Sequence, residues 1–138
     1  MMVVLDTNHY SELDRGSPAG ALLRERLLSR GEQPWLTVMT AEEVLRGRLA
    51  QIAADRERLL VHYDLFLNGL LTLAKWRFLS WTQAAQDTFD MLHFQRVRIG
   101  TVDLRIASLA MTHNTLLLSR NLVDFQKVPG LRVENWLD

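Results

Sequence analysis

The stretch GTVDLRIASLAMTHNTLLLS, residues 100–119, joins a helical pattern directly to an uninterrupted apolar run. Its first part predicts a helix from Gly100 through Met111, with apolar side chains patterned along it at Leu104, Ala107, Leu109 and Ala110. Its last part, TLLLS at 115–119, predicts a strand that is buried on both faces. A helix that leads into a strand of this kind is typical of a parallel α/β sheet.

Strands and helices alternate along the rest of the chain as well. Further strands are predicted at residues 2–5, 34–40, 77–81 and 131–133. Helices are predicted at about 7–14, 18–30, 41–74 with a break near 54–55, and 82–97. This alternation predicts an α/β fold with a mostly parallel sheet and helices on both of its faces. No repeat, low-complexity run or linker interrupts the pattern, so residues 1–138 are predicted to form a single domain.

The composition narrows the class of protein. The chain has 138 residues, of which 48% are hydrophobic and 23% charged, as in globular domains that bury a core of their own. The absence of cysteine excludes disulfides and thiolate zinc sites. Because 16 basic side chains balance 16 acidic ones, any contact with RNA or DNA must come from a local patch or from a bound metal ion.

The longest apolar stretch is LLVHYDLFLNGLLTLA, residues 59–74. It is shorter than the roughly 20 residues of a membrane span and is interrupted by His62, Asp64 and Asn68. The stretch therefore predicts a helix that is buried in the centre of the fold or that forms a groove or dimer face. The first residues lack the basic region of a signal peptide, so we expect a cytoplasmic location and no membrane contact.

Four acidic residues fall at the ends of predicted elements. Asp6 follows the first strand, and Asp124 follows the strand at 115–119. Glu43 lies in the first turn of one helix, and Asp103 in that of another. Functional groups gather at the carboxyl ends of parallel strands, so the four carboxylates could meet at one edge of the sheet. Such a cluster needs a cation to relieve its repulsion, and Mg²⁺ prefers oxygen ligands and can activate water against a phosphodiester.

Each of these acids also has a local explanation. Asp6 could cap the helix that follows it, and Glu43 could complete a capping box with Thr40. Asp103 could interact favourably with a helix dipole, and Asp124 could bond its own backbone in a turn. Spacing alone leaves both interpretations open.

Three segments resemble the PIN-domain family, and within it the VapC-like toxins of type II toxin–antitoxin systems. LDTNHYSEL at 5–13 is similar to the family's opening strand with its D-T-N motif, and TAEEVLRG at 40–47 to its E-L-x-x-G helix. IGTVDLRIASLAMTHNTLLLSRNLVDFQKVPGLRVENW, at 99–136, is similar to the C-terminal third. The resemblance implies a three-layer PIN-like fold with a central, mostly parallel sheet flanked by helices.

The function that the resemblance implies is a divalent-metal-dependent endoribonuclease that cleaves RNA phosphodiesters by metal-activated water. The implied cofactor is Mg²⁺ or Mn²⁺, and one or two ions could act. Asp6, Glu43 and Asp103 carry over as catalytic carboxylates and metal ligands, with Asn8 of the D-T-N motif as a supporting polar group. The implied partners are an RNA substrate, a cognate antitoxin protein and a second copy of the chain in a homodimer.

The fourth acidic position departs from the family pattern. Where the family often has T-x-D or T-N-[DN], this chain has Ser119, Arg120 and Asn121. Asp124 could supply the missing catalytic carboxylate, or Asn121 could bind water or metal through its neutral oxygen. Ser119 is expected to hold the site together by hydrogen bonding.

Basic side chains near these motifs are candidates for contacts with RNA phosphates, because arginine binds phosphate in a bidentate way. Arg46 and Arg120 are the main candidates, and the others are Arg48, Arg105 and Lys127. They could equally form a solvated surface that balances nearby acids. His9 is expected to be an incidental surface or packing residue.

Two other classes of protein compete with the nuclease. The first is a catalytically weak or inactive PIN-like module that binds RNA or protein and has lost metal at the altered fourth position. The second is an aspartyl-phosphate or receiver-type domain with Asp6 as the phosphoryl acceptor. It requires an acidic companion close to the acceptor and a lysine near the last strand, for which Lys127 is the only candidate.

Overall fold

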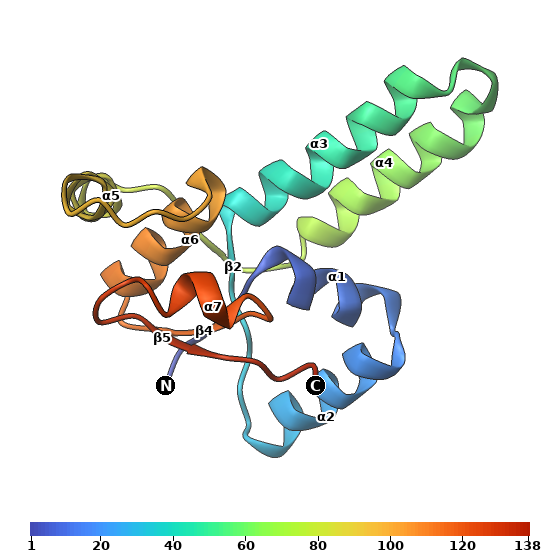
Figure 1. Ribbon diagram of the computed structural model, residues 1–138. Helices are drawn as coiled ribbons and strands as arrows, with labels where there is room; N and C mark the ends of the chain where they lie inside the picture. The colour runs from blue at the N-terminus through green and yellow to red at the C-terminus, as the bar shows by residue number, and fades with distance from the viewer.

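The computed structural model describes all 138 residues, and its centre is a parallel β-sheet (Figure 1). The strands are β1 Val3–Leu5, β2 Leu36–Thr37, β3 Phe78–Leu79, β4 Leu116–Leu118 and β5 Arg132–Glu134. They pair in the orders β1-β4-β5 and β2-β3, all in parallel. A parallel bridge between Val4 and Trp35 joins the two groups along the free side of β1. The strands are short, and β1 and β4 are fully buried, as uninterrupted apolar runs in α/β proteins are.

Helices fill the connections between the strands. They are α1 Thr7–Arg15, α2 Pro18–Ser29, α3 Val38–Ala54, α4 Leu59–Leu73, α5 Gln83–Phe94, α6 Thr101–Thr112 and α7 Leu122–Phe125, with a 3₁₀ turn η1 at Arg56–Arg58. The predicted break near 54–55 is confirmed between α3 and η1. Gly16 ends α1 with a φ of 63°, a left-handed conformation that glycine adopts at little cost.

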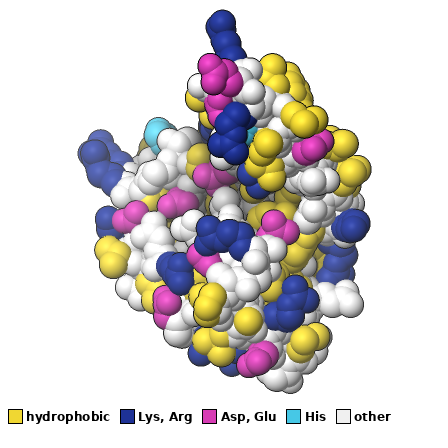
Figure 2. All heavy atoms as spheres, turned by 90° about the vertical axis from the view of Figure 1, so that its right-hand side faces the viewer, with side chains coloured by type: hydrophobic (Ala, Val, Ile, Leu, Met, Phe, Trp, Pro, Cys, Tyr) yellow, Lys and Arg dark blue, Asp and Glu magenta, His cyan; other side chains and the backbone are white.

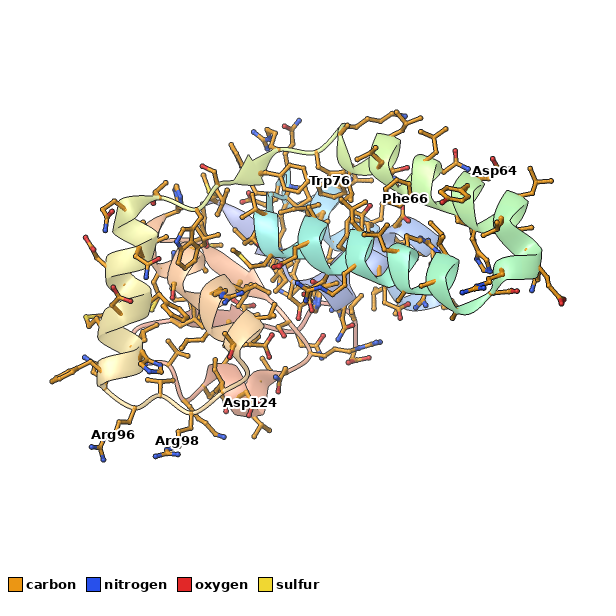
Figure 3. The ribbon with its side chains drawn as sticks, turned by 90° about the horizontal axis from the view of Figure 1, so that it is seen from above. Asp64, Phe66, Trp76, Arg96, Arg98 and Asp124 are labelled. Carbon is orange, nitrogen blue, oxygen red and sulfur yellow. The ribbon has the colours of Figure 1, made fainter.

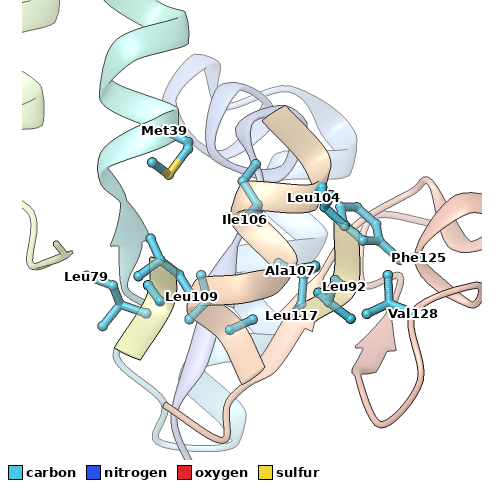
Figure 4. Packing of buried hydrophobic residues seen from close by; sticks show 13 residues of the cluster. Met39, Leu79, Leu92, Leu104, Ile106, Ala107, Leu109, Leu117, Phe125 and Val128 are labelled. Carbon is cyan, nitrogen blue, oxygen red and sulfur yellow. The ribbon is translucent and has the colours of Figure 1, made fainter. Parts of the chain in front are cut away.

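The alternation of side chains along the strands divides the core into two layers. Val4 of β1 and Leu117 of β4 belong to a cluster with α5, α6 and α7, whose packing is shown in Figure 4. Their neighbours Val3 and Leu5 point to the opposite face and pack in a cluster with α1 and α2. The sheet is thus covered on both faces, and the predicted three-layer α/β fold is confirmed.

Two local predictions were wrong at the start of α3. Residues 38–40, predicted as the end of a strand, form the first turn of the helix. Its N-cap is Thr37, whose Oγ1 accepts the backbone N–H of Thr40 at 3.4 Å, so the capping box of Thr40 with Glu43 does not form. The β-branched run Thr37–Val38 favours a strand locally, but β2 pairs with β3 over only two residues. The one-turn helix α7 was also not predicted, because four residues carry no helical periodicity.

Helices α3 and α4 form an antiparallel pair that projects from the body of the protein (Figure 1). Leu73 is the only buried residue of α4. Side chains at i, i+3 and i+4 spacing form an exposed apolar stripe along α4, made of Leu60, Tyr63, Leu67 and Leu71. Figure 2 shows hydrophobic side chains gathered at the top, where the pair projects. The interpretation of residues 59–74 as a centrally buried helix was therefore wrong. None of the helices combines the length and the apolar character that crossing a membrane requires.

Candidate active site

Three of the four predicted carboxylates line one small cavity at the carboxyl ends of β1 and β4. Asp6 comes from the β1–α1 junction, Glu43 from α3 and Asp103 from α6. The cavity has a volume of about 120 Å³, and its remaining lining residues are Thr7, Asn8 and Ile106. No lysine or arginine is among the lining residues, so the three carboxylates have no cation of the protein within the cavity wall.

Asp6 is both a helix cap and a wall of this cavity. Its backbone N–H donates to the carbonyl of Leu118 at 3.0 Å, which places it at the end of the β1–β4 ladder. Its Oδ1 accepts the backbone N–H of His9 at 2.9 Å and so caps α1. Its Oδ2 accepts no hydrogen bond from the protein and remains available to a ligand. The two interpretations of Asp6 were therefore not alternatives.

Glu43 is held in place by the D-T-N segment. The hydroxyl of Thr7 donates to Glu43 Oε1 at 2.5 Å and lies 3.1 Å from the hydroxyl of Thr40. Thr40 is fully buried one turn before Glu43, so α1 and α3 are joined at this point by a side-chain network. Because Thr7 lies in the D-T-N motif and Thr40 in TAEEVLRG, motif positions were the only sequence signal for this network.

Asn121 connects the remaining acids. Its Nδ2 donates to Asp103 Oδ2 at 3.1 Å and to Asp124 Oδ2 at 3.0 Å. Ser119 is fully buried, and its Oγ accepts the backbone N–H of Asn121 at 2.9 Å. Since carboxylates only accept, the amide nitrogen must face them, which leaves Asn121 Oδ1 without a partner in the protein.

Asp124 lies outside the cavity. It belongs to α7, where Figure 3 labels it, and it is not among the residues that line the carboxylate cavity. It pairs with Lys127 at 3.3 Å. It lines instead a neighbouring hollow of about 540 Å³ with Arg98 and His93. The structure thus brings Asp6, Glu43 and Asp103 together, and it joins Asp124 to them only through Asn121.

The electrostatics of the site differ between its two ends. Burial raises the pKa of Asp103, and the negative charges of Asp6, Glu43 and Asp124 raise it further, while the Asn121 amide opposes the shift. Hydrogen bonds from Asn121 and Lys127 lower the pKa of Asp124. A cation bound in the cavity would relieve the repulsion at Asp103, whereas the charge of Asp124 is already balanced by its neighbours.

The donor set suits a hard divalent cation, although not a cage made of protein side chains alone. Free oxygens face this region from Asp6, Asp103 and Glu43, and oxygen is the ligand that Mg²⁺ and Mn²⁺ prefer. No three acidic or histidine side chains of the chain converge closely enough to ligate one ion directly. Mg²⁺ commonly takes one or two carboxylates and retains several waters, so the arrangement fits that ion.

The two main basic candidates lie away from the cavity. Arg46 pairs with Glu42 at 2.6 Å on the exposed side of α3. Arg120 pairs with Asp138 at 3.3 Å and with Glu12 at 3.7 Å. Arg48 is better placed, because it lines a groove of about 260 Å³ that shares Thr7 and Glu43 with the carboxylate cavity.

Of the two roles expected for His9, the surface role was wrong, because the side chain is part of the buried interior. His9 is fully buried, and its Nδ1 lies 3.3 Å from Asp6 Oδ1. Its Nε2 accepts the backbone N–H of Trp136, a residue 127 positions away in the sequence. The three-residue spacing between Asp6 and His9 was the only sequence signal for the contact between these two side chains.

Named proteins and solved structures are similar to this chain over nearly its whole length. No protein-family model matches the chain. Over 134 residues it is 27% identical to Ribonuclease VapC1 of Rickettsia felis and 25% identical to Ribonuclease VapC of Rickettsia bellii, covering 96% of this chain and 95% of each relative. These relatives confirm the resemblance to VapC-like proteins that the motifs indicated.

Solved structures support the same fold. A chain of VapBC-1 from nontypeable Haemophilus influenzae superposes with a TM-score of 0.77 at 21% identity, covering 100% of both chains. A chain of DNA-bound VapBC from Salmonella typhimurium gives a TM-score of 0.74 at 20% identity, covering 99% of this chain and 98% of that one. A chain of VapBC2 from Rickettsia felis, bound to a promoter fragment, gives 0.72 at 20% identity, covering 99% of both. At these identities the likeness shows the fold alone.

Proposed function

We propose that this chain is a VapC-like toxin ribonuclease of a type II toxin–antitoxin pair, which cleaves RNA phosphodiesters with the help of a divalent metal ion. The observation that carries the proposal is the cavity in which carboxylates from three separate elements meet without a protein cation. The names of the two Rickettsia ribonucleases, which align with 96% of the chain, support the same activity.

Asp6 and Asp103 are the proposed main ligands of Mg²⁺ or Mn²⁺, and Glu43 assists through water or a second ion. When bound, such an ion supplies Lewis acidity for the phosphate and lowers the pKa of a coordinated water. The chain's own part is to hold the carboxylates in place before RNA arrives. Thr7 fixes Glu43, Asn121 fixes Asp103, and the end of the sheet fixes Asp6.

RNA is proposed to enter along the groove that Arg48 lines beside Glu43. The Arg48 guanidinium can bind a phosphate there without entering the carboxylate cavity. Arg46 and Arg120 are engaged in ion pairs with Glu42 and Asp138, so they are weaker candidates for that role.

The proposed protein partners are an acidic antitoxin and a second copy of the chain. The exposed apolar stripe on α4 offers a surface for such contacts, since contiguous apolar patches of this kind mark interaction sites in soluble proteins. The antitoxin is proposed to inhibit the enzyme by covering or entering the carboxylate cavity. Two solved structures of the same fold support this proposal: one is a toxin–antitoxin complex from Klebsiella pneumoniae, and the other is a member of the VapBC family of toxin–antitoxin systems from Mycobacterium tuberculosis.

The proposal is tested by RNA cleavage with Asp6→Asn. Asparagine is as good an N-cap as aspartate, so α1 and the fold should be retained. Removing the carboxylate takes away several kcal/mol of metal-assisted stabilisation, so we expect Mn²⁺-dependent cleavage of RNA to fall by at least about 100-fold. New RNA ends are mapped at equal protein concentration, and circular dichroism checks the fold.

Two pairs of variants control this test. Asp90→Asn removes an exposed carboxylate of α5 that bonds only Gln86, and it should cleave like the unmodified chain. Glu43→Gln should lose activity, whereas Glu42→Gln changes its exposed neighbour and should retain it. Cleavage by Asp6→Asn at the unmodified rate contradicts the proposal. A chain that binds RNA but shows no Mn²⁺-dependent cleavage is instead the inactive PIN-like module.

A further inference from the structure

His9 makes a contact that determines its protonated nitrogen. The side chain is fully buried in the first turn of α1, and its Nε2 lies 3.2 Å from the backbone nitrogen of Trp136. A backbone N–H can only donate, so Nε2 must be the unprotonated, accepting nitrogen of a neutral ring. The proton of that neutral ring is therefore on Nδ1.

The protonated side of the ring faces the site. His9 Nδ1 lies 3.3 Å from Asp6 Oδ1 and makes no hydrogen bond of good geometry with any group of the protein, so this carboxylate oxygen is a close electrostatic neighbour of the ring. Asp6 Oδ1 accepts the backbone N–H of His9 at 2.9 Å, so the same oxygen is bonded to the backbone of His9 and lies beside its ring. The second oxygen of Asp6, Oδ2, has no donor, and Asp6 lines the carboxylate cavity.

The far side of the ring is anchored by the hydrogen bond from Trp136. Trp136 and Leu137 are 3% and 2% exposed, and both belong to the core cluster beneath α1 and α2. The ring is thus held between the buried C-terminal segment and the carboxylate of Asp6. A histidine that served packing alone would not need a hydrogen bond at Nε2 and a carboxylate oxygen 3.3 Å from Nδ1.

We infer that His9 is a positioning residue, which orients the Asp6 carboxylate so that Oδ1 faces the ring and Oδ2 is presented to the metal. The inference rests on the proposed function, because it concerns the metal affinity of Asp6. Partners that hold ligating carboxylates commonly contribute to metal affinity without touching the metal. The proposed link runs from the backbone N–H of Trp136, through the imidazole ring of His9, to Oδ1 of Asp6.

Two substitutions separate the two ends of this link. In His9→Asn, the side-chain amide reaches only as far as Nδ1 did, so a donor toward Asp6 can remain while the acceptor for Trp136 is lost. In His9→Gln, the amide oxygen reaches as far as Nε2 did, so the Trp136 bond can remain while the donor toward Asp6 is lost. Each variant therefore retains one contact of the parent.

The test compares Mn²⁺ affinity with thermal stability in the full chain. Isothermal titration with MnCl₂ should show His9→Gln binding roughly 10- to 100-fold more weakly than the unmodified chain, with His9→Asn closer to it. Thermal unfolding without metal should show the opposite order, with His9→Gln the more stable variant. A purely structural histidine would give metal affinities that follow stability.

The outcomes distinguish this inference from the proposed function. If Asp6→Asn and the unmodified chain bind Mn²⁺ equally, or if neither binds it, both the proposed metal site and the inference are overturned. The metal site is supported if the unmodified chain binds Mn²⁺ strongly and Asp6→Asn binds it weakly. The inference alone is overturned if, in that case, both His9 variants bind Mn²⁺ normally, or if their Mn²⁺ affinities follow their thermal stabilities. Nitrogen NMR of the unmodified chain gives an independent check, because a neutral ring protonated on Nε2 is incompatible with the link.

Discussion

Asn121 illustrates how one side chain can settle the geometry of a site without supplying a charge. One amide nitrogen binds Asp103 and Asp124 together, which stabilises two carboxylates that would otherwise repel each other. An aspartate at position 121 would add a negative charge where the structure has a donor. In the structure the altered fourth position is therefore a hydrogen-bond donor that holds Asp103, one of the proposed ligands.

Tyr10 gives a pH prediction at the residue scale. Burial and the nearby charge of Asp14 raise its pKa to about 12 from 10.0. Above pH 10 the unfolded chain loses this proton while the folded chain keeps it, so the free energy of unfolding should fall as the pH rises from about 10 to about 12. The loss is at most about 2–3 kcal/mol over that window.

Thermal unfolding at pH 9 and at pH 11 measures this effect in Tyr10→Phe. The variant cannot titrate at this position and keeps the edge-to-face contact with Trp76, whose ring centroid lies 5.5 Å away. It should lose less stability between the two pH values than the unmodified chain does. Tyr63→Phe changes an exposed tyrosine of α4 and is the matched control. Equal losses in the unmodified chain and Tyr10→Phe would contradict the assignment.

At the scale of elements, the α3–α4 pair is the least self-sufficient part of the fold. Side chains of α4 that a single core would bury remain open to solvent, including Leu60 at 80% and Leu67 at 51% exposure. These exposed side chains contribute little to the stability of the isolated chain, because substitutions at exposed positions typically change the free energy of unfolding by only about 0.5 kcal/mol. A second chain that covers the stripe would explain why so many apolar side chains of α4 are exposed.

The double substitution Leu60→Glu and Leu67→Glu tests whether the stripe is an interface. Charges cannot be buried there without a large cost, so the variant should lose self-association and antitoxin binding while its melting temperature changes little. Sedimentation and light scattering measure the mass of the chain alone and of its complex with the antitoxin.

Phe94→Glu provides the matched control for this variant. Phe94 is 87% exposed and is the last residue of α5. Figure 1 shows α5 on the opposite side of the molecule from the projecting α3–α4 pair. An introduced charge there should leave the assembly unchanged. If the α4 variant assembles like the unmodified chain, the stripe is not the interface.

At the scale of the whole molecule, the carboxylate cavity joins parts that are distant in the sequence. Asp6 lies near the start of the chain and Asp103 lies 97 positions later, and the sheet places them together because β1 and β4 are adjacent and parallel. Bringing like charges together lowers the stability of the chain without metal. Metal binding should therefore stabilise the entire fold.

Thermal unfolding with and without Mn²⁺ measures this coupling. At a free Mn²⁺ concentration of about 100 times the dissociation constant, stability should rise by about 2.7 kcal/mol, a shift of roughly 10 °C for a chain of this size. A chelator should reverse the shift, and Asp6→Asn should not show it. An equal shift in that variant would place the metal elsewhere.

Much of this architecture is encoded locally and could be predicted. The buried strands β1 and β4, the cap at Asp6 and the stop at Gly16 depend on neighbouring residues, so sequence patterns identify them. The ordered motifs also identified Asp6, Glu43 and Asp103 as one group. Thr37 as the cap of α3 was missed, because Thr40 with Glu43 gives an equally good local signal.

The sequence by itself determined the α/β class, the order of most elements and the three carboxylates that share a cavity. Only the tertiary structure decided that Asn121 donates to two acids, that Asp124 lies outside the cavity and that the His9 ring lies between Trp136 and Asp6. The physical reason is the range of the interactions. Propensities, caps and apolar periods act over a few residues, whereas a side-chain hydrogen bond depends on atoms that only the completed sheet brings together.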